Sequence, residues 1–125
     1  MSNPITGRCH CGAIRYQVNG PLTGVIHCHC SDCRRWHGHF SAYAVALLED
    51  LEFTQGEDKL KWYASSDRAR RGFCPDCGSS IFKDNLDGEK IVLSVGALDA
   101  PTGMSFMKNI FTDSKGDYYE LPHEH

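Results

Sequence analysis

All seven cysteines of the chain fall into three short clusters. The clusters are Cys9-His10-Cys11, Cys28-His29-Cys30-Ser31-Asp32-Cys33 and Cys74-Pro75-Asp76-Cys77. Thiolates spaced this closely can converge on one soft cation such as zinc without a long loop having to close around it. The cysteines divide most simply into four and three, with the pair Cys9 and Cys11 joining the pair Cys74 and Cys77. We therefore predict two zinc ions per chain.

The two groups predict different kinds of zinc site. Four thiolates fill the tetrahedral shell of zinc, as in structural sites, whereas three protein ligands leave one position for a substrate. We expect the four-cysteine group to hold a structural zinc. The remaining three residues, Cys28, Cys30 and Cys33, are expected to hold a catalytic zinc.

Other uses of these cysteines are less consistent with the pattern. An odd number of cysteines cannot form a complete set of internal disulfides, and residues 1–4 show no secretory leader. A redox dithiol would need only one cluster, and an iron–sulfur cluster fits the division into four and three poorly. One of His27, His37 or His39 could still close the three-cysteine site and make it structural.

The bulk composition favours one small domain in the cytoplasm. The chain has 125 residues, 41% of them hydrophobic, and no apolar run approaches the ~20 residues that span a bilayer. Its net charge of -3 and pI near 6.1 give no electrostatic support for nucleic acid or a membrane surface as a partner. The sequence leaves the oligomeric state open.

The chain pattern predicts a mainly β fold of short antiparallel strands. In the segment 13–18, Ile14, Tyr16 and Val18 alternate with polar residues, as in a half-buried strand. Further strands are predicted at 25–28, 40–48, 60–63, 69–73, 80–82, 91–95 and 109–112. Ser31 is predicted to cap a single helical turn over 32–35. No window of twelve residues shows a helical period.

Four motifs, in this order, resemble the glutathione-dependent formaldehyde-activating family, which also includes centromere protein V. The motifs are Gly7-Arg8-Cys9-His10-Cys11-Gly12, then 28–35, then 73–82, and finally Gly96-Ala97-Leu98-Asp99. The similarity covers about residues 7–121 of a single domain that we place at 1–125. One departure is visible, because the family often has a small residue where Trp36 and His37 stand.

The resemblance implies a β-tent-like fold with a structural zinc on the four-cysteine group and a second, catalytic zinc on the three-cysteine group. It also implies addition of the glutathione thiol to formaldehyde, which gives S-hydroxymethylglutathione and is classed as a carbon–sulfur lyase reaction. The implied partners are thus a small-molecule thiol, glutathione, and formaldehyde or another small aldehyde.

This chemistry needs an acid near the metal and cations for the carboxylates of glutathione. His37 and His39 are the candidate catalytic residues, since histidine titrates near neutral pH. Arg34 and Arg35 are the candidate glutathione-binding residues, because an arginine fork matches a carboxylate. His29, between two ligands on a tight turn, is expected to point away from the metal.

Three more arginines, at positions 68, 70 and 71, precede the last cysteine cluster. On an alternating strand, Arg68 and Arg70 share one face and Arg71 lies on the other, so all three cannot line one pocket.

Two other functions stay open at this point. One is a zinc-stapled binding or scaffold module without catalysis, of the centromere-protein type. No basic or disordered extension that would engage nucleic acid or microtubules is visible in the sequence. The other is an enzyme of the same fold that acts on a different small electrophile.

Overall fold

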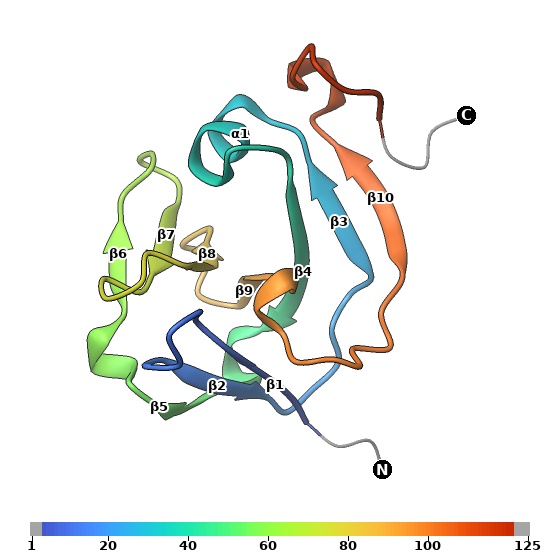
Figure 1. Ribbon diagram of the computed structural model, residues 1–125. Helices are drawn as coiled ribbons and strands as arrows, with labels where there is room; N and C mark the ends of the chain where they lie inside the picture. Colours follow the sequence, from blue (N-terminus) through green and yellow to red (C-terminus); the bar gives the residue numbers. More distant parts are fainter. Residues whose placement is uncertain (1–3, 122–125) are drawn as a thin grey trace.

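In the computed structural model, which describes residues 4–121, the strands form two sheets (Figure 1). The smaller sheet has the order β1 (Ile5–Arg8), β2 (Arg15–Val18), β5 (Leu51–Gln55). The larger sheet has the order β10 (Phe106–Ile110), β3 (Val25–Cys28), β4 (Ser41–Leu47), β9 (Lys90–Ser94), β8 (Ser80–Asp84), β7 (Arg70–Phe73), β6 (Lys61–Tyr63). The prediction of a mainly β fold is confirmed.

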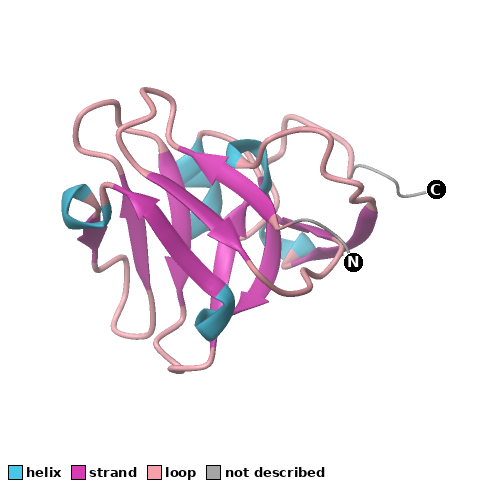
Figure 2. Cartoon of the chain, turned by 90° about the horizontal axis from the view of Figure 1, so that it is seen from below, coloured by secondary structure: helices cyan, strands magenta, loops and turns pink. Residues whose placement is uncertain are grey.

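The helical segments between and after the strands are short (Figure 2). They are α1 (Ser31–His37) and the 3-10 turns η1 (Leu48–Asp50), η2 (Glu57–Lys59), η3 (Val95–Ala97) and η4 (Thr112–Ser114). No helix among residues 4–121 is long and apolar enough to cross a membrane.

Antiparallel pairing dominates both sheets, with β10 and β3 as the parallel exception. Between the sheets lies the main core, in which Tyr16 of β2 packs on Phe82 of β8 with ring centroids 4.9 Å apart. The predicted alternation is confirmed, since Ile14, Tyr16 and Val18 are all buried. The burial of these apolar residues supplies much of the driving force that holds the sheets together.

Sequence reasoning missed β1 and β5 and placed the last strand a few residues too late. β1 contains Gly7, which weakens a strand signal. That glycine is needed for packing, because a Cβ at position 7 would lie 2.5 Å from the ring of Tyr16. The requirement comes from the facing strand, so it is invisible in the local sequence.

The helical turn is longer than predicted, and its cap differs. α1 extends to His37 and ends at Gly38, which adopts the left-handed φ of 83°. The N-cap is Cys30 rather than Ser31, because the Cys30 sulfur accepts a hydrogen bond of 3.3 Å from the amide of Cys33. A prospective metal ligand therefore also fixes the start of the helix.

Candidate metal centres and the adjoining cavity

The four-cysteine group joins the two sheets. Cys9 and Cys11 follow β1 of the smaller sheet, whereas Cys74 and Cys77 follow β7 of the larger one. Their four sulfurs lie within 4.8 Å of one another, and Cys11 Sγ is 3.8 Å from Cys74 Sγ across 63 sequence positions. All seven cysteines are free thiols. Four converging sulfurs are the donor set that a closed zinc site uses, so the group fits the predicted metal.

Local turns aim these sulfurs at one point. Gly12 and Gly78 follow the last cysteine of each pair, and both adopt a left-handed φ near 80° that glycine reaches without strain. Burial raises the pKa of Cys77, but hydrogen bonds, first among them the one with Ser79 at 3.2 Å, outweigh it and bring the value to about 5. These bonds thus stabilise negative charge on the Cys77 sulfur, the form that binds a metal.

The three-cysteine group is built within one short segment of the larger sheet. Cys28 ends β3, Cys30 caps α1, and Cys33 lies in the first turn of α1. Their sulfurs also lie within 4.8 Å of one another. Within residues 4–121 no histidine or carboxylate joins this group, so the alternative of a closing His27, His37 or His39 finds no support there. Three converging sulfurs suit a zinc with an open position.

A buried cation stands behind the three-cysteine group. Arg71 of β7 is only 1% exposed, and its Nη2 lies 3.6 Å from Cys33 Sγ and 3.6 Å from the carboxylate of Asp32. Its Nη1 donates to the hydroxyl of Tyr43 at 2.9 Å. The hydrogen bond between the Cys28 and Cys33 sulfurs, helped by Arg71 and opposed by burial, lowers the pKa of Cys33 to about 3. This sulfur is therefore an anion at neutral pH.

His37 connects this group to a cavity. Its Nε2 lies 2.9 Å from the Tyr43 hydroxyl, which in turn lies 3.8 Å from Cys33 Sγ. Burial lowers the pKa of His37, although the charge on Cys33 works in the opposite direction, so the imidazole is neutral at pH 7. His37 thus bridges the metal ligands and the space in front of them.

The cavity has a volume of about 770 Å³, enough for a peptide-sized ligand. His37, Trp36 and Ser41 line the end near the three cysteines, and Ser41 Oγ donates to the Cys28 carbonyl at 3.5 Å. Trp36 forms a wall instead of filling the space, because its indole donates to Ser80 and stacks on Tyr63. The cysteine sulfurs of this group do not line the cavity themselves.

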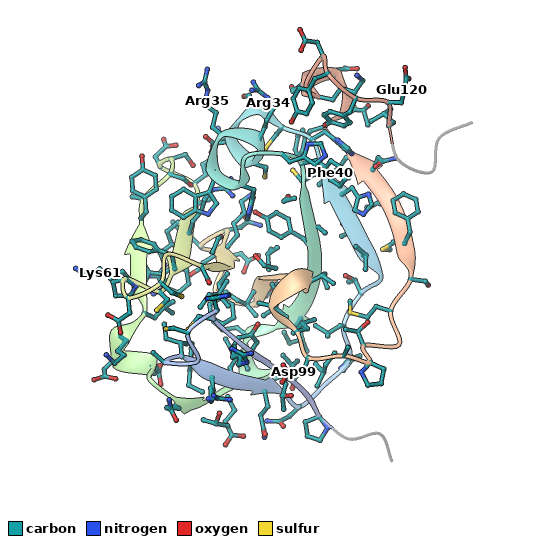
Figure 3. The ribbon with its side chains drawn as sticks, viewed as in Figure 1. Arg34, Arg35, Phe40, Lys61, Asp99 and Glu120 are labelled. Carbon is teal, nitrogen blue, oxygen red and sulfur yellow. The ribbon has the colours of Figure 1, made fainter. Side chains whose placement is uncertain are left out.

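The other predicted site residues lie elsewhere. His39 bonds the hydroxyl of Tyr118 at 2.9 Å and does not line the cavity. Arg34 and Arg35 extend from α1 at the top of the molecule, and neither lines the cavity (Figure 3). His29 is fully buried and bonds Tyr119 and Asn109 through its two ring nitrogens, as expected for a side chain that points away from the metal.

Sequence reasoning missed Tyr43 and underrated Arg71. The predicted alternation did place Arg71 on the face opposite Arg70, which forms a partly exposed ion pair with Asp84 of β8. The only available signal was therefore a charged side chain on the inward face of a strand. An arginine almost never lies fully buried unless it is paired, so that position indicated an anionic partner.

Comparison with known proteins gives consistent results. A family model described as glutathione-dependent formaldehyde-activating enzyme matches residues 4–114, which include both cysteine groups. An uncharacterized lyase of Schizosaccharomyces pombe is 26% identical over 117 residues, which cover 92% of this chain and 83% of the relative. A Halomonas elongata protein, provisionally named glutathione-dependent formaldehyde-activating enzyme, is 30% identical over 86 residues, or 62% of this chain and 54% of the relative. The crystal structure of a Rhodobacter sphaeroides protein matches with a TM-score of 0.63 at 28% identity, covering 83% of this chain and 98% of that one.

Proposed function

The chain belongs to the glutathione-dependent formaldehyde-activating enzyme family, and we propose that it is a zinc-dependent carbon–sulfur lyase that joins glutathione to formaldehyde or another small aldehyde. One observation carries the proposal beyond the family. The three-cysteine group has no fourth ligand within residues 4–121 and is linked to a cavity of about 770 Å³ through His37 and Ser41. An incomplete ligand shell beside a large cavity is the arrangement of a working metal site rather than a structural one.

The two cysteine groups would hold different zinc ions. The four-cysteine group would hold the structural ion, and Cys28, Cys30 and Cys33 would hold the catalytic one. When bound there, zinc supplies a Lewis acid that lowers the pKa of a thiol and polarises a carbonyl.

The reaction moves one proton from sulfur to oxygen. A C–S bond forms as the thiolate attacks the aldehyde carbon, the electron pair of the C=O bond moves to oxygen, and that oxygen takes a proton. The thiol proton leaves to solvent, so the product R–S–CH₂–OH balances.

We assign the proton delivery to His37. The Tyr43 hydroxyl accepts a hydrogen bond from Arg71, which leaves its own proton for His37 Nε2. Because Nε2 accepts that bond, the neutral tautomer with the proton on Nδ1 is favoured, and Nδ1 remains available to a ligand. His37 would then donate from Nδ1 to the developing alkoxide while Nε2 takes the Tyr43 proton, and the pair would recover that proton from water.

His39, Arg34 and Arg35 stay predictions in this scheme. None of the three lines the cavity. His39 is therefore a weaker candidate acid than His37, and a cation other than Arg34 or Arg35 is favoured for binding carboxylates inside the cavity. The same assay separates them, because a residue that takes part must change the rate or the affinity when it is replaced.

The exchange between glutathione, formaldehyde and their adduct can be followed by ¹³C exchange NMR, which also measures the uncatalysed rate. We expect the zinc-loaded protein to accelerate exchange, Cys33→Ser to abolish the acceleration, and His37→Gln to reduce it roughly 10²–10⁴-fold, the usual contribution of a general acid. His39→Gln measured alongside tests the second histidine.

No acceleration by zinc-loaded protein would contradict the proposal. In that case, saturable glutathione binding would favour an enzyme that uses another electrophile, and no binding would favour the scaffold module.

A further inference from the structure

The end of the cavity away from α1 contains two side chains of opposite charge, Arg8 and Asp99. Figure 3 shows Asp99 beside the N-terminal strands, on the side of the molecule opposite Arg34 and Arg35. Both residues stand in sequence motifs to which the proposed reaction gives no role. This end of the cavity therefore has chemistry still to be explained.

Backbone and side-chain bonds fix the position of Asp99 against β1. The amide of Asp99 donates to the Thr6 carbonyl at 2.8 Å, and the Thr6 hydroxyl donates to Asp99 Oδ2 at 2.6 Å. Thr6 and Arg8 are two positions apart, so both side chains lie on the same, exposed face of the strand. The carboxylate and the base of the arginine are thus separated by roughly 7 Å along β1, two residue rises.

Both charged groups keep unused bonding capacity. Arg8 lines the cavity, and in the described part of the chain only its Nη1 is used, donating to the carbonyls of Cys9 and His10 at 3.1 and 2.8 Å. Within residues 4–121 neither Arg8 nor Asp99 belongs to an ion pair. A cation with free donors and an anion with a free oxygen therefore face one space without neutralising each other.

We propose that Arg8 and Asp99 form a subsite for the zwitterionic head of an α-amino acid, with the α-carboxylate on Arg8 and the α-ammonium on Asp99. Both residues line the same cavity, so one such head can meet both charges, each through a charge-assisted hydrogen bond of about 2.8 Å. The inference rests on the proposed function, in which the γ-glutamyl end of glutathione is such a head. The glycyl end has a carboxylate alone, which Asp99 would repel.

This orientation directs the rest of the tripeptide along the cavity toward Trp36, Ser41 and His37. The subsite would select thiols that carry a free amino-acid head over thiols that lack one. It would act on affinity and leave the reacting atoms to the other end of the cavity.

The test is calorimetric binding of glutathione to the full zinc-loaded chain without aldehyde, compared with glutaryl-cysteinylglycine, which lacks only the α-ammonium. We expect Asp99→Asn to weaken glutathione roughly 10- to 100-fold, as for a lost charge-assisted hydrogen bond, and to change the glutaryl analogue less than about twofold. Arg8→Gln should weaken both ligands, since both keep the carboxylate. Asp67→Asn and Arg68→Gln, on exposed residues outside the cavity, are the matched controls and should change neither.

The proposal is overturned if Asp99→Asn weakens both ligands equally or neither, or if the wild-type chain binds no glutathione. Because Arg8 also holds the carbonyls of Cys9 and His10, Asp99→Asn decides the result if Arg8→Gln fails to fold. Failure of the subsite and failure of the reaction are distinguishable. If Asp99→Asn selectively weakens glutathione but the zinc-loaded protein does not accelerate exchange, the proposed reaction is wrong and the subsite stands. If the protein accelerates exchange but Asp99→Asn shows no such selectivity, the subsite is wrong and the reaction stands.

Discussion

The two cysteine groups use the same ligand atom in opposite structural situations. The four-cysteine group draws its members from the ends of two different sheets, so bringing its sulfurs together also brings the sheets together. The three-cysteine group lies within the single segment from β3 to α1, where neighbouring residues hold it in place. The first group therefore contributes to global stability, and the second mainly to a local environment.

The two groups also differ in the chemical groups that surround their sulfurs. Amide and hydroxyl groups serve the four-cysteine group, as in the 3.3 Å bond from the Ile14 amide to Cys9 Sγ. The three-cysteine group also receives an amide hydrogen bond, but in addition it has a buried guanidinium, Arg71, at 3.6 Å from Cys33 Sγ. A full positive charge beside three thiolates reduces the net negative charge of that group. This reduction favours a site that must accept a further anionic ligand.

The largest expected effect tests the four-cysteine group. Replacing Cys77 with serine should abolish cooperative folding, because binding of a structural zinc contributes on the order of 10 kcal/mol, comparable to the whole stability of a small domain. Thermal denaturation followed by circular dichroism measures this. A soluble Cys77→Ser protein with an unchanged melting temperature would show that this group does not hold the sheets together.

An intermediate effect should come from the buried cation. Arg71→Met should destabilise the fold by about 1.5–3 kcal/mol through loss of hydrogen bonds to charged partners, and should weaken metal binding only at the three-cysteine group. Urea denaturation measures the change in the free energy of unfolding, and chelator competition measures the change in metal affinity. The neighbouring Arg70→Met is the matched control. Its ion pair with Asp84 is 40% exposed on the arginine side, so it should cost about 1 kcal/mol or less and leave metal affinity unchanged.

The smallest effect on folding is expected at the three-cysteine group itself. Cys33→Ser should remove one of two bound metal ions and all activity, while the β-sheet signal and most of the stability persist, because only five positions separate Cys28 and Cys33. Metal analysis with circular dichroism checks both parts. Loss of both ions together with the β signal would reverse the roles that we give the two groups.

Sequence reasoning reached the features that local spacing encodes. Cysteines two or three positions apart, and the alternation of Ile14, Tyr16 and Val18, restrict the local structure strongly enough to be read without the fold. The cap made by Cys30 was missed because a cysteine sulfur is an unusual N-cap acceptor, and the neighbouring serine is the more common choice.

The environment of the three-cysteine group could not be predicted from the sequence for a different reason. Tyr43 and Arg71 meet there only because β4, β9, β8 and β7 pair in that order. That pairing brings residues 28 positions apart into a 2.9 Å hydrogen bond. The cavity has the same origin, since its walls come from the first cysteine pair, α1 and η3. Such juxtapositions depend on long-range strand order, which the local pattern does not determine.

The separation of ligands along the chain also sets an order of events during folding. The closure of a short loop is faster and costs less entropy than the closure of a long one. A nascent chain can therefore gather Cys28, Cys30 and Cys33 around a metal ion before any sheet exists. The site that joins Cys11 to Cys74 across 63 positions forms only when the sheets have met. The first ion captured during synthesis would then occupy the three-cysteine group, and the ion that completes the fold would arrive last.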